Sequence, residues 1–366
     1  SRNDDVGRLN IDYIKYILKN KLIKIIPYKY RKPFILVFAV LSLSVVLVAG
    51  VADELQAQEK RQGWIKRLRY RRELRRELQG EIQLSGAFAL YPMAVKWAEE
   101  FRKIHPKVRI DISAGGAGKG ITDALAKVVD LGMVSRDIYP QELEKGAFPI
   151  AVVKDAVVPT INSNNPLIDQ ILATGLKQQV AQDLWIHTTA RTWGDVLGTG
   201  STIPVHVYTR SDACGAAETF AAWLGAKQED LEGTAVFGDP GVTSVVQRDK
   251  VGIGFNNIAY AYDINSKKPY RHIAVIPLDL NGNGKIDPEE DFYATSTELN
   301  AAIAEGKYPS PPARNLFLVS NGKPMKPEVL AFLEFILTDG QQYAPEVGYI
   351  GLSSDILEEE LFKLQE

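Results

Sequence analysis

The stretch Tyr208 to Phe220, YTRSDACGAAETF, holds the only cysteine of the 366-residue chain. It follows a short β-like run, Ile203 to Tyr208, and opens a segment with the pattern of a helix. The first amides of a helix have no partner within it, and together with the positive end of the helix dipole they bind anions. Cys214 at such a turn is a candidate nucleophile, a spectator, or a replacement for another residue.

Two further turns have the same small-residue character, namely SGAFALYP (85–92) and SAGGAGKGI (113–121). Around them, β-like runs alternate with helical ones: Glu81 to Leu84 precedes Met93 to Ile104, and Val108 to Ile112 precedes Ile121 to Val128. This alternation predicts an α/β domain with mainly parallel sheets. Each turn alone is weak evidence, because small residues also form plain tight turns. The three together, one of them carrying Arg210, predict an anion site.

The chain resembles the phosphate-type solute-binding proteins of ABC transporters. The resemblance runs from Glu81 to Leu352 and rests on seven segments in the family's order and near its spacing: SGAFALYPMAVKWAEEFRKIHP, SAGGAGKGI, DLGMVSRDI, VVKDAVVPTIN, YTRSDACGAAETF, GIGFNNIAY and YPSPPARNLFLV. It implies a two-lobed type II periplasmic-binding-protein fold with the ligand in the cleft. The implied crossover strands are Ala151 to Ile161 and Pro311 to Val319. The expected parts are lobe 1 (81–157 and 312–352), lobe 2 (158–311) and a C-terminal helix (353–366).

The resemblance also implies a set of binding residues, from which this chain departs. In the phosphate-binding relatives, hydroxyls on three loops, backbone amides and an arginine held by an aspartate bind the oxyanion. Arg210 and Asp212 take the places of that arginine and aspartate, and Ser135 falls where relatives carry Asp or Ser. Four expected hydroxyls are replaced, by Phe88, Ala117, Cys214 and Ala216. We therefore interpret Cys214 as a replaced serine.

The expected anion site relies on backbone amides and arginine. Its residues are Ala87, Phe88, Ala117, Gly118, Ser135, Arg136, Arg210, Asp212, Cys214, Gly215 and Ala216. The amides of Phe88, Gly118, Cys214, Gly215 and Ala216 do not depend on side-chain identity. Arg136 either turns inward as a second cation or pairs with Asp137 at the surface. No motif ties any of the four histidines to Cys214, so we predict that the chain is not an enzyme.

A second motif, DLNGNGKIDPEE (279–290), fits the calcium loop of an EF-hand. Gly284 makes the sharp turn of such a loop. The expected ligands are the side chains of Asp279, Asn281, Asn283, Asp287 and Glu290 and the carbonyl of Lys285. The preceding RHIAVIPLDL has the pattern of a strand and not of the helix of an EF-hand, and the sequence has only one such loop. The motif therefore predicts a structural Ca²⁺ site and not a calcium sensor. The alternative is a polar loop with Asn-Gly turns.

The N-terminal region predicts a membrane anchor. PFILVFAVLSLSVVLVAGV (33–51) carries no charge and is long enough to cross a bilayer. The alternative is the apolar part of a secretory signal. We predict a single-pass anchor at 33–52, a basic amphipathic cytoplasmic segment at 1–32 that lies on an anionic membrane face, and a basic helical linker at 53–80 that faces lipid headgroups or a membrane partner. The alternative for both basic segments is a solvated charged helix. The resemblance places the globular domain in the periplasm, beside the inner membrane.

Composition narrows the function further. The formal net charge of −2 gives no argument for a nucleic-acid partner, and one cysteine excludes an internal disulfide framework. The first expectation is a membrane-anchored binding protein that delivers phosphate or a related oxyanion to an ABC permease. The alternative is a structural or regulatory subunit of an inner-membrane complex of the envelope, with a degenerate ligand cleft. The four lost hydroxyls favour the alternative, whereas Arg210, Asp212 and the glycine-rich turns favour the first.

Overall fold

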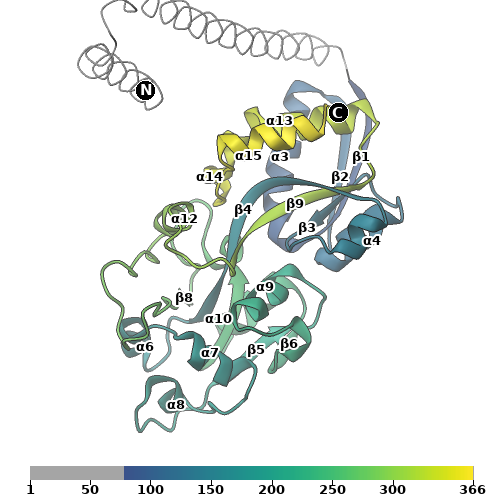
Figure 1. Ribbon diagram of the computed structural model, residues 1–366. Helices are drawn as coiled ribbons and strands as arrows, with labels where there is room; N and C mark the ends of the chain where they lie inside the picture. Colours follow the sequence, from purple (N-terminus) through teal and green to yellow (C-terminus); the bar gives the residue numbers. More distant parts are fainter. Residues whose placement is uncertain (1–77, 366) are drawn as a thin grey trace, which may run out of the picture. The chain divides into compact units, whose positions relative to one another are not determined.

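The computed structural model describes residues 78–365 of the chain (Figure 1). The predicted cytoplasmic segment 1–32, the anchor 33–52 and nearly all of the linker 53–80 lie outside the described residues. Within the described range, no helix combines the length and the apolar character needed to cross a membrane.

Lobe 1 is a sheet covered by helices that come from both ends of the described chain (Figure 1). Its strands β1 (Gln79–Gly86), β2 (Lys107–Ala114) and β3 (Leu131–Val134) lie in the order β2-β1-β3, and β1 is parallel to both neighbours. Its helical elements are η3 (Phe88–Leu90), α3 (Tyr91–Ile104), α4 (Ala117–Leu125), α5 (Pro140–Glu144), α13 (Pro327–Leu337), η5 (Asp339–Tyr343), α14 (Ala344–Val347) and α15 (Ser354–Lys363). Phe101 of α3 packs on Phe332 and Phe335 of α13, with ring centroids 5.2 and 5.6 Å apart.

Lobe 2 surrounds an aromatic core. Its strands are β5 (His206–Arg210), β6 (Thr234–Val236), β7 (Gly252–Asn257) and β8 (Ile273–Val275). Its helices are α6 (Ile168–Thr174), α7 (Gln178–Trp185), α8 (Trp193–Leu197), α9 (Gly215–Trp223), η4 (Gln228–Asp230), α10 (Gly238–Arg248), α11 (Ile258–Ala261) and α12 (Ser296–Ala304). Phe220 stacks on Phe255 at 4.4 Å and meets Trp185 edge-on at 5.0 Å, and all three side chains are buried. This core fixes α9 over the carboxyl end of β5.

Two long strands connect the lobes, β4 (Ala147–Asn162) and β9 (Ala313–Asn321) (Figure 1). They pair antiparallel with each other over most of β9. β9 also pairs with β3, whereas the last part of β4 pairs with β7 and β8. The nearly unbroken apolar run of β4 matches this position, because a strand buried on both faces needs no polar alternation. The two-lobed fold implied by the resemblance is therefore confirmed.

The expectation of mainly parallel sheets is wrong at the junction of the lobes. The β1–β2, β1–β3, β5–β6 and β5–β7 pairs are parallel, but β3–β9, β4–β9, β4–β7 and β4–β8 are antiparallel. The reason is the connectivity: β4 carries the chain from lobe 1 into lobe 2, and β9 carries it back. The alternation of β and α segments predicts the parallel strand pairs inside each lobe. It does not show that the chain returns to lobe 1 through β9, which makes the crossover strands antiparallel.

Candidate functional site

The three small-residue turns meet where the two lobes touch. The amide of Gly118 in lobe 1 donates to the Ala213 carbonyl in lobe 2 at 3.3 Å, and Tyr260 Oη donates to the Phe88 carbonyl at 3.1 Å. A Cβ placed on Gly215 would lie 2.0 Å from the Ser135 carbonyl oxygen, so only glycine fits there. The structure thus brings the predicted residues of both lobes together, with the lobes closed on one another.

Arg210 lies at the base of this contact and is held by two carboxylates. As the last residue of β5, it donates from Nε and Nη2 to Asp212 at 2.9 and 2.7 Å, and from Nη1 to Asp239 at 2.8 Å. Burial of the guanidinium acts to lower its pKa, but the nearby carboxylates outweigh burial and the pKa is raised. The Arg210 side chain has 0% exposure. Three of its five N–H groups are engaged by these carboxylates, which leaves two.

Asp239 was not among the residues expected from the sequence. It is the second residue of α10, and its Oδ1 accepts from the amide and the side chain of Asn257 at 3.0 and 2.8 Å. The sequence feature that could have identified Asp239 is GDPGV (238–242), another small-residue turn between a strand and a helix. With two carboxylates around one guanidinium, the cluster of Arg210, Asp212 and Asp239 carries a formal charge of −1. Attraction of an anion must therefore come from backbone amides.

Some of the predicted amides are already used. The Cys214 amide donates to Gln228 Oε1 at 3.1 Å, and the Gly118 amide is engaged across the lobes. The amides of Phe88, Gly215 and Ala216 have no acceptor among residues 78–365. Gly215 and Ala216 are the first two residues of α9, so their N–H groups lie at the positive end of the helix. These two amides, the Phe88 amide and the two remaining N–H groups of Arg210 are the parts of the predicted site that remain available to an anion.

Apolar side chains occupy three further predicted positions, Ala87, Phe88 and Ala117. Ala87 and Ala117 are buried, and the Phe88 ring crosses from lobe 1 to lobe 2. It meets Phe237 edge-on at 5.8 Å, and a Cβ on Gly238 would lie 3.2 Å from the ring. The residue that replaces a hydroxyl in the first turn therefore packs the contact between the lobes.

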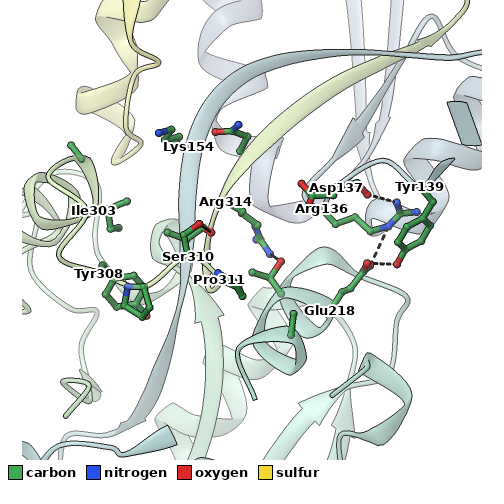
Figure 2. A pocket seen from close by; sticks show the side chains of 17 residues that line it. Arg136, Asp137, Tyr139, Lys154, Glu218, Ile303, Tyr308, Ser310, Pro311 and Arg314 are labelled. Atoms are coloured by element: carbon green, nitrogen blue, oxygen red, sulfur yellow. Dashed lines mark hydrogen bonds and ion pairs between the residues drawn. The ribbon is translucent and has the colours of Figure 1, made fainter. Parts of the chain in front are cut away.

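Arg136 follows neither of the two expectations from the sequence. It forms a two-point ion pair with Glu142 at 2.8 and 2.7 Å. Its Nε lies 3.1 Å from Glu218 of α9, as Figure 2 shows. Its guanidinium lies over the Tyr139 ring, 4.2 Å from the centroid. With Asp137 it shares only a hydrogen bond to the backbone carbonyl, at 2.8 Å. Arg136 thus ties lobe 1 to α9 and is not a second cation of the anion site.

Cys214 has the environment of a structural residue. Its Sγ caps α9 by accepting from the Ala217 amide at 3.5 Å. Burial raises the pKa of the thiol to about 12, although Arg210 opposes the shift. We expect iodoacetamide at pH 8 to leave the native thiol unmodified, because the thiolate is the reactive form. Mass spectrometry checks this, with the protein unfolded in guanidinium chloride as the reactive control. A native thiol that reacts as fast as free cysteine would contradict the assignment.

The predicted calcium loop is folded around its first and last acidic residues. Asp279 accepts hydrogen bonds from the amides of Gly282, Asn283 and Gly284, and Glu290 accepts from those of Leu280 and Asn281. Both residues are buried, each with 5% of its surface exposed. These bonds hold the ends of the loop together, so the backbone is arranged for residues 279 and 290 to face one another.

Other expected ligands have different partners. Asp287 accepts from the side chains of Asn281 and Asn283 at 3.0 and 2.7 Å, and its other oxygen lies 2.6 Å from Lys285 Nζ. Across the described range, no three His, Cys, Asp or Glu side chains converge as a metal site. The loop conformation agrees with the motif, and Ca²⁺ binding stays a prediction.

Two known proteins with similar sequences cover most of this chain. Protein SphX of Synechococcus elongatus is 28% identical over 279 residues, which cover 74% of this chain and 77% of that protein. Phosphate-binding protein PstS of Pseudomonas aeruginosa is 27% identical over 311 residues, which cover 78% and 87%. The PstS relative is a binding protein by name, which confirms the prediction that the chain is not an enzyme.

Solved structures and a family model agree on the fold. A Clostridium perfringens substrate-binding protein structure with bound phosphate has a TM-score of 0.62 at 22% identity, covering 75% of this chain and 100% of its own. A phosphate transport receptor of Vibrio cholerae gives 0.55 at 19%, covering 74% and 100%. A family model described as the PBP superfamily domain matches residues 73–340. Since this match spans most of the sequence, the chain belongs to the PBP superfamily.

Proposed function

We propose that the chain is an extracytoplasmic binding protein for phosphate or a related oxyanion. The observation that carries this proposal is the pair of unpartnered amides at Gly215 and Ala216, which begin α9 at the contact between the lobes. Helix N-termini of this kind bind oxyanions. The phosphate-binding relatives support the same ligand class.

Binding requires the lobes to separate first, because the Arg210 side chain has 0% exposure in the closed arrangement. Opening breaks the Gly118–Ala213 hydrogen bond and lifts the Phe88 ring from Phe237. An oxyanion then accepts from the amides of α9 and from the two remaining N–H groups of Arg210. Each lost hydrogen bond to a charged ligand weakens binding by about 1.5–3 kcal/mol. With four hydroxyls replaced, affinity for phosphate is lower than in a hydroxyl-lined cage.

The proposal includes the predicted location and partners. The segment 33–52 anchors the protein in the inner membrane by a single pass, and the two-lobed domain lies in the periplasm. The basic segments 1–32 and 53–80 contact the lipid bilayer. The bound oxyanion is delivered to an ABC permease, and nucleic acid is not a partner.

A second candidate function follows from the closed contact itself. Arg210 is neutralised by Asp212 and Asp239, the amides of Gly118 and Cys214 are engaged, and Phe88 packs between the lobes. These features favour a structural or regulatory subunit of an envelope membrane complex, in which the cleft stays closed and empty of ligand.

Reintroducing two of the replaced hydroxyl side chains, at positions 214 and 216, distinguishes the two candidate functions. The full chain in detergent is titrated calorimetrically with phosphate, sulfate, molybdate and tungstate, next to the variant Cys214→Ser/Ala216→Thr. For a working site we expect the wild type to bind one of these anions and the variant to bind phosphate at least tenfold more tightly. The exposed Ala301→Thr is the matched control and leaves the affinity unchanged. Silence of both proteins toward all four anions would reject the binding function and leave the closed subunit.

We also propose that loop 279–290 binds a structural Ca²⁺ ion. Buried carboxylates at both ends of the loop and the EF-hand spacing support this assignment. The metal would be held by Asp279, Asn281, Asn283, Asp287 and Glu290 with the Lys285 carbonyl, and it would cross-link the loop. A ligand that binds only the folded state adds about 2.7 kcal/mol of stability at a hundredfold excess over its Kd.

Calcium should therefore raise the thermal midpoint, and Glu290→Gln should remove most of that rise. The measurement is thermal unfolding of the full chain in Ca²⁺ and in chelator, with the exposed neighbour Glu289→Gln as the matched control. Equal midpoints in Ca²⁺ and in chelator would reject the metal site.

A further inference from the structure

Arg314 of β9 connects a crossover strand to the start of α9. Its side chain is 6% exposed, and Figure 2 shows it extending from β9 toward the helix that carries Glu218. Its Nη1 donates to the Gly215 carbonyl and, at 2.9 Å, to Thr219 Oγ1. Gly215 is the first residue of α9, and Thr219 lies one turn later. A buried guanidinium from a strand between the lobes therefore holds the first turn of the helix that begins at the anion site.

The Gly215 carbonyl and the Ala216 amide belong to the same peptide group. In a planar trans peptide the C=O and the N–H point in opposite directions. Arg314 bonds to one end of this group, while the N–H at the other end has no acceptor in the described part of the chain. A charged donor on the carbonyl polarises the peptide, because linked hydrogen bonds strengthen one another at low dielectric. The Ala216 N–H is thereby a stronger donor to an anion than an ordinary helix amide.

The same guanidinium reaches Arg210 through two buried residues. Arg314 Nη2 donates to Asn257 Oδ1, and Asn257 Nδ2 donates to Asp239 Oδ1 at 2.8 Å. The other oxygen of Asp239 accepts from Arg210 Nη1 at 2.8 Å. Asn257 and Asp239 are each 1% exposed, so solvent screens these contacts little. Counted with Arg314, the formal charge of the cluster of Arg210, Asp212 and Asp239 rises from −1 to zero.

Asp155 of β4 is the counter-charge of Arg314. Its Oδ2 lies 3.7 Å from Arg314 Nη2, and the residue is 1% exposed. Burial raises the pKa of the Asp155 carboxyl to about 7, although Arg314 opposes the shift. The other ionisable groups that act on it are Asp239 of α10 and the hydroxyls of Tyr308 and Tyr349, and burial raises the pKa of both tyrosines well above its usual value. Asp155 therefore changes charge near neutral pH, whereas the two tyrosines stay neutral.

We propose, on the basis of the oxyanion-binding function proposed above, that Arg314 is a positioning residue of the anion site. It strengthens the Ala216 N–H and orients Arg210 through Asn257 and Asp239, and a charged Asp155 weakens this action. Arg314 thus supplies, from behind the site, part of the attraction that the four replaced hydroxyls no longer supply. An ionised Asp155 draws on the same guanidinium, so the site binds an anion more tightly when Asp155 is neutral.

Two variants that both carry Asp155→Asn measure the contribution of Arg314. Asp155→Asn and Asp155→Asn/Arg314→Met, as full chains in detergent, are titrated calorimetrically with phosphate, sulfate, molybdate and tungstate, next to the wild type. For the anion that the wild type binds, we expect the double variant to bind at least tenfold more weakly than Asp155→Asn. Arg271→Met, at an exposed arginine of lobe 2, is the matched control and leaves the affinity unchanged. Equal affinities of the single and the double variant would overturn the proposal.

The single variant Asp155→Asn gives a readout that a purely structural role of the pair would not give. It keeps Oδ1, which accepts from the Ala156 amide at 2.7 Å, and removes the charge. If the pair only held the fold, the variant would bind the anion more weakly or equally well. We expect it to bind at least threefold more tightly than the wild type at about pH 8, with the difference vanishing toward about pH 6. Comparing both proteins at each pH cancels the titration of the anion itself.

Tryptophan fluorescence and thermal unfolding first establish that each variant is folded. Should Arg314→Met prevent folding, the pH profile of Asp155→Asn decides alone, and weaker binding or a difference independent of pH would overturn the proposal. A wild type that binds, with unchanged affinity in the variants, rejects only the role of Arg314. Silence of the wild type and of all variants toward the four anions would instead reject the proposed function itself.

Discussion

Arg210→Met is expected to lower the free energy of unfolding by about 3–5 kcal/mol. The substitution leaves the carboxylates of Asp212 and Asp239 buried, with side-chain exposures of 5% and 1%, and without their cation. Breaking a buried ion pair by removing one partner costs this much because the remaining charge is not compensated. Urea unfolding of the full chain, followed by tryptophan fluorescence, measures the difference.

Two variants separate lost charge compensation from lost packing. Arg210→Met/Asp212→Asn/Asp239→Asn removes the uncompensated charges and should recover most of the lost stability. Arg109→Met, which breaks the exposed pair with Asp111 at 2.8 Å, should change stability by less than about 1 kcal/mol. If Arg210→Met were as mild as Arg109→Met, the buried cluster would not stabilise the fold. This instability is also why restored hydroxyls, and not the loss of Arg210, serve to test anion binding.

Gly215→Ala is expected to shift the protein toward separated lobes. The added Cβ would lie 2.0 Å from the Ser135 carbonyl oxygen and 2.4 Å from Ser135 Oγ, and backbone atoms cannot move aside cheaply. Overpacking of this kind costs about 1–3 kcal/mol, which is enough to change a two-state population several-fold to a hundredfold. Because Gly215 lies in lobe 2 and Ser135 in lobe 1, opening relieves the clash.

Spin labels on exposed Met325 of lobe 1 and Ile264 of lobe 2, in a Cys214→Ser background, report the separation of the lobes. Their distance distribution should move to longer values in Gly215→Ala. Gly200→Ala is the matched control, because a Cβ there meets nothing within 4 Å. An unchanged distribution in Gly215→Ala would mean that the contact between the lobes tolerates a methyl group.

The sequence predicts the parts of the fold that depend on local pattern. The apolar run in VVKDAVVPTIN identifies a buried strand, and the structure extends it to Ala147–Asn162 because pairing with β9 continues past the run. What local pattern lacks is strand direction: whether β4 and β9 run antiparallel is decided by pairing partners more than 150 residues apart.

The site divides in the same way. Arg210 and Asp212 are two residues apart, so their ion pair is visible as a motif. Asp239 lies 29 residues from Arg210, and only the packing of α10 beside β5 brings them together. The hydrogen bond from the Cys214 amide to Gln228 Oε1, which makes that amide unavailable to an anion, likewise depends on tertiary packing. Sequence reasoning therefore identifies which groups can bind an anion, and packing decides which of them are free.

The position of β9 also sets an order of assembly. This strand lies between β3 and β4 in the sheet, although it is the last strand in the chain. Until residues 313–321 are synthesised, β3 keeps an unpaired edge, whereas the β4–β7–β5–β6 pairs of lobe 2 are already complete. An exposed strand edge is a template for pairing with other chains. Lobe 2 can thus fold first, and the nascent chain is most prone to aggregate in the interval before β9 closes lobe 1.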